Sequence, residues 1–114
     1  LFDSNVLIDV FDGVRMDSFV YDADVAISII PKIEVAVGEP ALGGSYDWSR
    51  FSVIPIDGRI EAETIRLRRS TRLKLPDALI LATAKVHADA LATEDDRLAS
   101  AAGTFPVVRP RLAK

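Results

Sequence analysis

Residues 24–38, DVAISIIPKIEVAVG, join a strand pattern directly to a helix pattern. The first half, residues 24–30, is a short apolar run rich in β-branched side chains, which is typical of a buried strand. Pro31 then begins a helix that Gly38 ends, because proline suits a first helical turn and glycine suits a helix end. The stretch therefore predicts one strand–helix unit of an α/β fold.

The same alternation continues on both sides of this unit. Residues 1–3 read as the end of a strand, and residues 5–11 have the apolar spacing of a helix that Asp12-Gly13 ends. Residues 39–49 are predicted mainly as loop and residues 109–114 as a loose basic tail. The remaining predicted strands are 51–56, 88–93 and 105–108, and the remaining predicted helices are 60–72, 75–87 and 95–102.

Short apolar strands that alternate with helices predict strand–helix–strand units and helices on both faces of one sheet. We therefore expect a single domain over residues 1–114, built as a three-layer α/β/α sandwich with a mostly parallel central sheet. The chain opens within a predicted strand and without Met, so we expect residues ahead of Leu1.

The composition excludes several classes of chemistry. The chain has no cysteine among its 114 residues, which rules out disulfides, thiolate catalysis and cysteine-held metal sites. This absence is compatible with a reducing cytoplasm, where we expect the protein to act. No apolar run approaches the roughly 20 residues that a membrane-spanning helix needs, so no membrane partner is predicted.

The charge is unevenly distributed. The net charge of −3 argues mildly against a nucleic-acid partner. Six of the fourteen basic residues, however, fall within residues 59–74: Arg59, Arg66, Arg68, Arg69, Arg72 and Lys74. This cluster is either a solvated helix face or a ridge that contacts phosphates.

Four acidic residues follow predicted strands or begin predicted helices: Asp3, Glu34, Asp77 and Asp95. The carboxyl ends of parallel strands meet at one edge of a sheet, so these side chains are expected to converge. Converging carboxylates repel one another unless a cation lies among them. Oxygen ligands without cysteine indicate a hard ion, Mg²⁺ or Mn²⁺.

Each acid also has a purely structural explanation. Asp3, Asp77 and Asp95 could cap or charge the first turn of the helix that follows. Glu34 could point to solvent from an amphipathic helix. Asp96 is as good a helix cap as its neighbour, so the choice between the two as a metal ligand stays open. The set of four at strand-to-helix junctions favours a shared site.

Four segments of the chain resemble, in order, the motifs of PIN domains, especially the VapC-type toxin ribonucleases. The opening LFDSNVLID is similar to a strand that ends in Asp–Ser/Thr–Asn before a helix. Residues 27–38 are similar to the second segment, with Pro31-Lys32 where Thr or Leu is usual. The third match is LPDALILATA, residues 75–84, and the fourth is LATEDDRL, residues 91–98. The stretch between the second and third motifs is short for this family, which predicts a reduced substrate-gripping clip.

The resemblance implies a metal-dependent endoribonuclease that cleaves RNA. Mg²⁺ or Mn²⁺ would be held by Asp3, Asp77 and Asp95, or by Asp96 in place of Asp95. Glu34 would bind a second ion or act as general base on the attacking water. The groups implied to orient the carboxylates are Ser4, Asn5 and Thr93, and those implied to hold the RNA backbone are Arg59, Arg66, Arg69 and Arg72.

The resemblance also implies partners: a cognate antitoxin protein, as for the toxin of a type II toxin–antitoxin pair, and a second copy in a homodimer. Two alternatives stay open, namely an RNA-processing PIN nuclease that is not a toxin and a non-catalytic PIN-like module that binds RNA or protein. A phosphatase of the haloacid dehalogenase type is disfavoured, because Asn5 occupies the place of its second aspartate.

Overall fold

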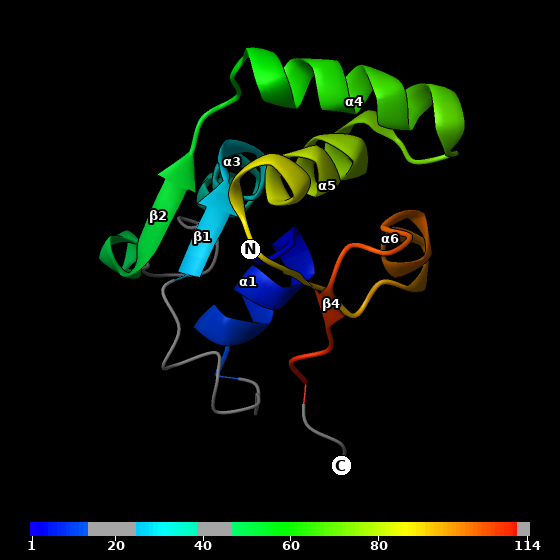
Figure 1. Ribbon diagram of the computed structural model, residues 1–114. Coiled ribbons are helices and arrows are strands. Elements are labelled where there is room, and N and C mark those ends of the chain that lie inside the picture. Colours follow the sequence, from blue (N-terminus) through cyan, green and yellow to red (C-terminus); the bar gives the residue numbers. More distant parts are fainter. Residues whose placement is uncertain (14–24, 39–46, 112–114) are drawn as a thin grey trace.

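The computed structural model describes residues 1–13, 25–38 and 47–111 of the chain (Figure 1). Its elements, in order, are α1 (Ser4–Phe11), β1 (Val25–Ser28), α3 (Ile29–Gly38), the 3₁₀ turn η2 (Trp48–Arg50), β2 (Phe51–Ile54), α4 (Gly58–Ser70), α5 (Leu75–His87), β3 (Leu91–Ala92), α6 (Asp96–Ala101) and β4 (Val107–Val108). The predicted helices are thus present, and the later predicted strands are present but shorter than their apolar runs, whereas the strand predicted at residues 1–3 is reduced to bridges at Phe2.

The helix predicted to begin at Pro31 begins two residues earlier, at Ile29. The reason is local. The Ser28 hydroxyl accepts a hydrogen bond from the backbone N–H of Ile30 at 3.2 Å, which caps the helix at that point. Pro31 then lies in the first turn, where its missing N–H leaves no bond unmade.

All described strands run parallel. β1 pairs with β2 from Val25↔Phe51 onward, and β3 pairs with β4 from Leu91↔Val107. Phe2 forms parallel bridges to both β1 and β3, so the segment around it joins the two pairs. The order across the sheet is therefore β2, β1, the Phe2 segment, β3 and β4. The first segment in sequence is the central one, and the chain winds away from it in both directions.

Side chains of these strands alternate between two hydrophobic clusters. Phe2 packs with residues of α1 and α3, whereas its neighbour Leu1 packs against residues of α4, α5 and α6. β3 follows the same rule, since Leu91 belongs to the second cluster and Ala92 to the first. Successive strand residues point to opposite faces of a sheet, so the clusters lie on its two sides. The three-layer α/β/α prediction is confirmed.

Helices α4 and α5 form an antiparallel hairpin that crosses the top of the view in Figure 1. At one end Asp57, which caps α4, contacts His87 at 2.6 Å, and at the other the guanidinium of Arg68 donates to the carbonyl of Leu73 at 2.7 Å. Each helix has 13 residues, and no described helix is both long enough and apolar enough to cross a membrane.

The prediction of a loose tail is wrong for the part of it that the structure describes. Pro110 is buried, and the guanidinium of Arg111 donates to the Asp9 carboxylate at 2.7 Å. One ion pair to α1, a second from Arg109 to Asp96 on α6, and the burial of Pro110 hold these residues in place, which the basic composition alone could not reveal. Of the predicted loop 39–49, residues 39–46 lie outside the described residues, and Asp47 caps the short turn η2.

Candidate functional site

Asp3 lies at the carboxyl end of the central strand segment and caps α1. Its carboxylate accepts a hydrogen bond from the backbone N–H of Val6 at 2.8 Å and another from the hydroxyl of Thr93. The residue is only 4% exposed. Here the sheet order reverses, since the next strands lie on opposite sides, and such switch points are where open α/β sheets bind ligands.

Thr93 connects Asp3 to Asp95. Its buried hydroxyl donates to Asp3 and accepts a hydrogen bond from the backbone N–H of Asp95 at 3.0 Å. The Asp95 carboxylate in turn caps α6 by accepting from the N–H groups of Arg97 and Leu98 at 2.8 and 3.1 Å. The predicted orienting role of Thr93 therefore has a direct structural counterpart, because one hydroxyl positions two acids that are distant in sequence.

Asp77 lies in the first turn of α5, half-buried, and interacts electrostatically with the other two acids. Partial burial raises the pKa of Asp77 above its ordinary value, and the charge of Asp95 raises it further against the opposing charge of Lys74. Burial likewise raises the pKa of Asp3, with Asp95 and Asp77 adding to it. Hydrogen bonds from Thr93 and Val6 oppose this rise. Both shifts are typical of carboxylates gathered without a cation.

Glu34 is exposed on α3 and lies at the edge of this group. The hydroxyl of Ser4 donates to its carboxylate at 3.4 Å, which links α3 to the start of α1. Asn5 is exposed on α1 and lines a cavity of about 350 Å³ together with Asp9, Asp95 and other residues. Glu34 and Ser4 are thus brought together, whereas Asn5 faces the side of the site on which Asp9 lies.

Asp95 and Asp96, the two candidate ligands at this position, have different surroundings. Asp96 is solvent-exposed, and its carboxylate accepts from the guanidinium of Arg109 at 2.9 Å. Only Asp95 of the two contributes to the raised pKa values of Asp3 and Asp77. The structure therefore brings Asp95, and not Asp96, toward the other two acids.

The acids fit a hard divalent cation in kind, since they offer oxygen atoms alone and repel one another without an ion. As the side chains lie, however, no three carboxylate or imidazole groups within residues 1–13, 25–38 and 47–111 are grouped closely enough to hold one metal ion. Binding a cation would therefore require the side chains of Asp3, Asp77 and Asp95 to turn toward it.

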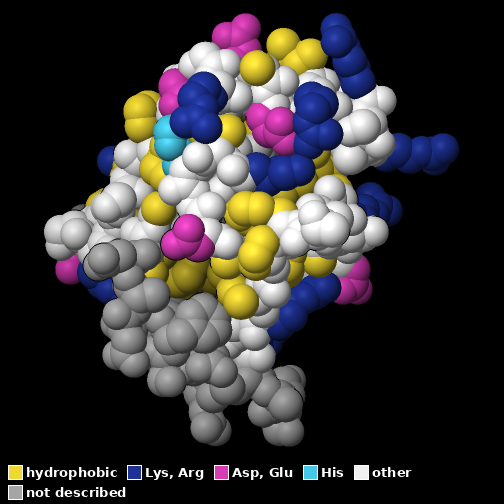
Figure 2. All heavy atoms as spheres, viewed as in Figure 1, with side chains coloured by type: hydrophobic (Ala, Val, Ile, Leu, Met, Phe, Trp, Pro, Cys, Tyr) yellow, Lys and Arg dark blue, Asp and Glu magenta, His cyan; other side chains and the backbone are white. Residues whose placement is uncertain are grey.

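The predicted arginine ridge is divided along the α4–α5 hairpin. Arg66 pairs with Glu63, and these two residues line one cavity with Arg59. That cavity also includes Lys85, which places it toward the far end of α5 from Asp77. Arg72 lies beyond α4, at the end of the hairpin that carries Asp77. Figure 2 shows Lys and Arg side chains standing out over α4 and this end of the hairpin.

The sequence prediction missed Asp9, Glu94 and Arg111. All three line the cavity that also holds Asp95, and the backbone N–H of Arg111 donates to Glu94 at 3.4 Å. A signal for Asp9 was available, because it stands four residues after Asn5 and so on the same face of α1. Nothing local indicates Arg111, which reaches Asp9 only through the tertiary fold.

Replacing Asp3 by asparagine should stabilise the metal-free protein at neutral pH. Asn keeps the helix cap and removes a buried charge. The pKa of Asp3 is raised by folding from its ordinary 3.8, so the ionised group destabilises the fold above the raised pKa, and this penalty vanishes as pH falls below the unfolded value. Urea unfolding in chelator should show an Asp3→Asn advantage at pH 7 that shrinks on acidification; an advantage that is constant with pH would contradict it.

Comparison with known proteins gives one family and two structures. The model of the PIN domain family matches residues 41–104. A toxin–antitoxin complex from Klebsiella pneumoniae contains a chain 36% identical to this one, with a TM-score of 0.79 and coverage of 95% of this chain and 94% of that one. FitAcB from Neisseria gonorrhoeae is 21% identical with a TM-score of 0.69, over 95% of each chain, and shows the shared fold. A search of curated proteins gave no match.

Proposed function

Because this chain belongs to the PIN domain family, we propose that it is a Mg²⁺- or Mn²⁺-dependent endoribonuclease and the toxin of a toxin–antitoxin pair. One observation carries the catalytic part of the proposal. Asp3, Asp77 and Asp95 come from three separate elements, yet they interact electrostatically at the switch point of a parallel sheet. Groups with perturbed pKa values gathered at such a place are candidates for chemistry.

When bound by these carboxylates, a divalent cation would supply charge stabilisation at a phosphate and an activated water. The chain supplies the positioning. Thr93 and the N–H of Val6 hydrogen-bond to the Asp3 carboxylate, and the N–H groups that start α6 hydrogen-bond to the Asp95 carboxylate. Glu34, oriented by Ser4, would accept a proton from the attacking water at its carboxylate.

The toxin part of the proposal rests on similarity. The Klebsiella pneumoniae chain is 36% identical over nearly its whole length and belongs to a toxin–antitoxin complex. We therefore infer a cognate antitoxin protein as the partner of this chain and a homodimer as its assembled form. Co-expression with the product of a neighbouring small reading frame tests the partner, because an inhibitor should both bind this chain and suppress RNA cleavage.

Mn²⁺ should raise the melting temperature of the wild-type protein, and Asp95→Asn should lose most of this rise. A ligand that binds only the folded state stabilises it by about 2.7 kcal/mol at one hundred times its dissociation constant. Asn preserves the cap of α6, so the metal-free Asp95→Asn protein should stay folded. Thermal unfolding with and without Mn²⁺, reversed by chelator, measures the difference.

Asp96→Asn is the matched control for this experiment, since it removes an adjacent carboxylate that pairs with Arg109. It should retain the full Mn²⁺-induced rise. Equal rises in both variants would refute a metal site at Asp95, and loss in Asp96→Asn alone would move the ligand to the neighbouring residue.

A further inference from the structure

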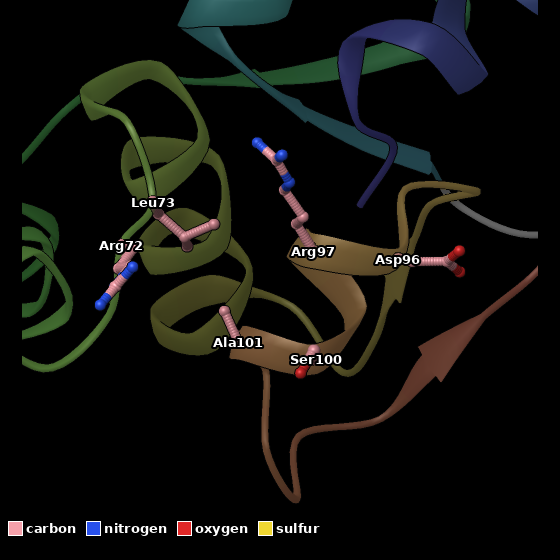
Figure 3. A pocket seen from close by; sticks show the side chains of 6 residues that line it. All are labelled: Arg72, Leu73, Asp96, Arg97, Ser100 and Ala101. Atoms are coloured by element: carbon pink, nitrogen blue, oxygen red, sulfur yellow. The ribbon is translucent and has the colours of Figure 1, made fainter.

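A cavity of about 700 Å³ adjoins the acidic site between the α4–α5 link and α6. It is lined by Arg72, Leu73, Asp96, Arg97, Ser100 and Ala101 (Figure 3). Leu73 precedes Asp77 by four residues, and Asp96 directly follows Asp95. The cavity therefore lies beside two of the three acids, on the same side of the sheet as α5.

Two guanidinium groups at this cavity have no partner among the residues that the structure describes. Within the described residues, no side-chain hydrogen bond or ion pair involves Arg72 or Arg97, both of which are exposed. Among the other arginines of the described residues, Arg66 pairs with Glu63, Arg68 with Leu73, Arg109 with Asp96 and Arg111 with Asp9, whereas Arg59 and Arg69 on α4 also lack such a partner. Arg72 and Arg97 are thus available to bind an anion, and arginine suits phosphate because its planar donors match two oxygens at once.

The one acid of the lining does not neutralise them. The Asp96 carboxylate is bound to Arg109, and Figure 3 shows its side chain pointing away from the side chain of Arg97. The local charge of the cavity is therefore positive, in a protein whose net charge is −3. Positive charge beside an acidic cluster is what a polyanionic substrate needs in order to approach it.

Between the arginines the wall is apolar and small. Leu73 is buried and its side chain points toward α6 in Figure 3, where Ala101 faces it and Ser100 adds a hydroxyl. Small-ligand sites typically measure about 300–1,000 Å³ and combine apolar walls with a few polar groups. The volume and lining suit a single nucleobase with its sugar.

We propose that this cavity is the nucleotide subsite of the RNA substrate next to the scissile phosphate. Arg72 and Arg97, which stand on opposite sides of Leu73 in Figure 3, contact backbone phosphates on the two sides of the cavity, and an unstacked base lies against Leu73 and Ala101 with Ser100 within reach of its edge. Single-stranded RNA is recognised in this way, through splayed bases and backbone contacts. The inference rests on the proposed function, and it replaces the predicted arginine ridge along α4 by Arg72 at the end of the hairpin and Arg97 on α6.

RNA fits this cavity better than a protein segment does. The free groups are both cationic, and two exposed guanidiniums on either side of an apolar wall match the phosphates of an RNA backbone and one base. Binding of the antitoxin at the same place is the alternative that the experiment tests.

The experiment measures binding of a fluorescent single-stranded RNA of about 12 nucleotides by anisotropy, in chelator so that no cleavage occurs. Arg72→Ala and Arg97→Ala should each weaken binding roughly tenfold, the loss of a charge-assisted contact. Each should also reduce the slope of log K against log salt by about 1. Arg50→Ala is the matched control, since it removes an exposed arginine before β2, at the far side of the sheet, and should leave binding near the wild-type value, whereas Arg59→Ala and Arg69→Ala test the predicted ridge along α4.

The base contact is tested with a second variant. Ser100→Trp fills the cavity from an exposed position, so the fold should be kept, as circular dichroism will verify. Wild-type protein should lose affinity for RNAs that lack one base at a single position, and Ser100→Trp should be insensitive to that base. An equal loss of affinity wherever the missing base lies would show that no single base occupies the cavity, and would overturn the subsite.

The remaining outcomes are distinct. Weaker binding by Arg59→Ala and Arg69→Ala, with Arg72→Ala and Arg97→Ala unaffected, would return the RNA to the α4 face and overturn the proposal. Unchanged RNA binding with weakened antitoxin binding would make the cavity a protein site, which also overturns it. Failure of the wild-type protein to bind any RNA would refute the proposed function itself, whereas binding without a defect in Arg72→Ala and Arg97→Ala would refute only the subsite.

Discussion

Asp77→Asn should reduce metal-dependent RNA cleavage by about 100-fold or more while leaving the protein folded. The substitution removes one of three carboxylates that interact at the switch point, and an amide neither carries the charge nor binds a hard cation as well. A loss of this size corresponds to about 2.7 kcal/mol in the barrier, at ~1.36 kcal/mol for each tenfold change. Single-turnover cleavage of a labelled RNA in Mn²⁺ measures it.

A measurement of stability separates a loss of catalysis from a loss of folding. Burial and the charge of Asp95 raise the pKa of Asp77, so removing its charge should leave the free energy of unfolding in chelator unchanged or higher. Asp89→Asn is the control, because Asp89 is an exposed acid before β3, at the amino ends of the strands and so opposite to the site. Wild-type cleavage by Asp77→Asn, or an equal loss in Asp89→Asn, would remove Asp77 from the proposed mechanism.

The largest expected effect on stability comes from Leu81→Ala. Leu81 is fully buried at the middle of α5, in the cluster that joins α4, α5 and α6 to the sheet. Removing a buried leucine side chain leaves a cavity and costs about 2–5 kcal/mol. Since domains are stable by only about 5–15 kcal/mol, the variant should unfold at a much lower urea concentration, as tryptophan fluorescence or circular dichroism will show.

Leu75→Ala on the same helix is the matched control. Leu75 is 52% exposed in the first turn of α5, so the same substitution removes little buried surface. Its effect on the free energy of unfolding should stay within about 0.5 kcal/mol. Comparable losses in the two variants would mean that α5 does not occupy the central position that the structure gives it.

Local sequence signals determined most of the elements. Asp57 caps α4, and Gly13 and Gly103 take positive φ angles after α1 and α6. The nearly uninterrupted apolar run of residues 78–84 forms the buried middle of α5. These features depend on neighbours within a few residues, through helix caps, turn geometry and hydrophobic period. They were therefore visible in the sequence, as was the alternation that predicts a parallel sheet.

Element ends were less accessible. The apolar runs 88–93 and 105–108 suggested longer strands than Leu91–Ala92 and Val107–Val108, because apolar composition marks burial and not the extent of backbone pairing. Ser28 shifted the start of α3 by a side-chain hydrogen bond that competes with strand geometry. Whether a residue such as Ser28 ends a strand or caps a helix depends on its tertiary contacts, which the sequence does not show.

The candidate acids were named from sequence, but their grouping depends on the order of strands. Phe2 bridges β1 and β3, and only this central position brings Asp3 beside Thr93 and Asp95. The hydrogen bond between Asp3 and Thr93 joins residues that are 90 positions apart in the chain. Asp96 instead pairs with Arg109 at the surface, a contact that also depends on the tertiary fold. Asp95 and Asp96 are equivalent in the sequence, so only the packing of α6 determines which carboxylate faces the other acids.

The sequence by itself determined the α/β class, the helix caps and the acidic residues available for a metal, because these follow from periodicity and from chemistry at single positions. Only the tertiary structure decided that Asp95 and not Asp96 joins Asp3 and Asp77, and that the arginines divide between two ends of a hairpin. It also placed Arg111 on Asp9. The physical reason is that a site is made by residues distant in sequence, whose proximity is set by strand order and packing across the sheet.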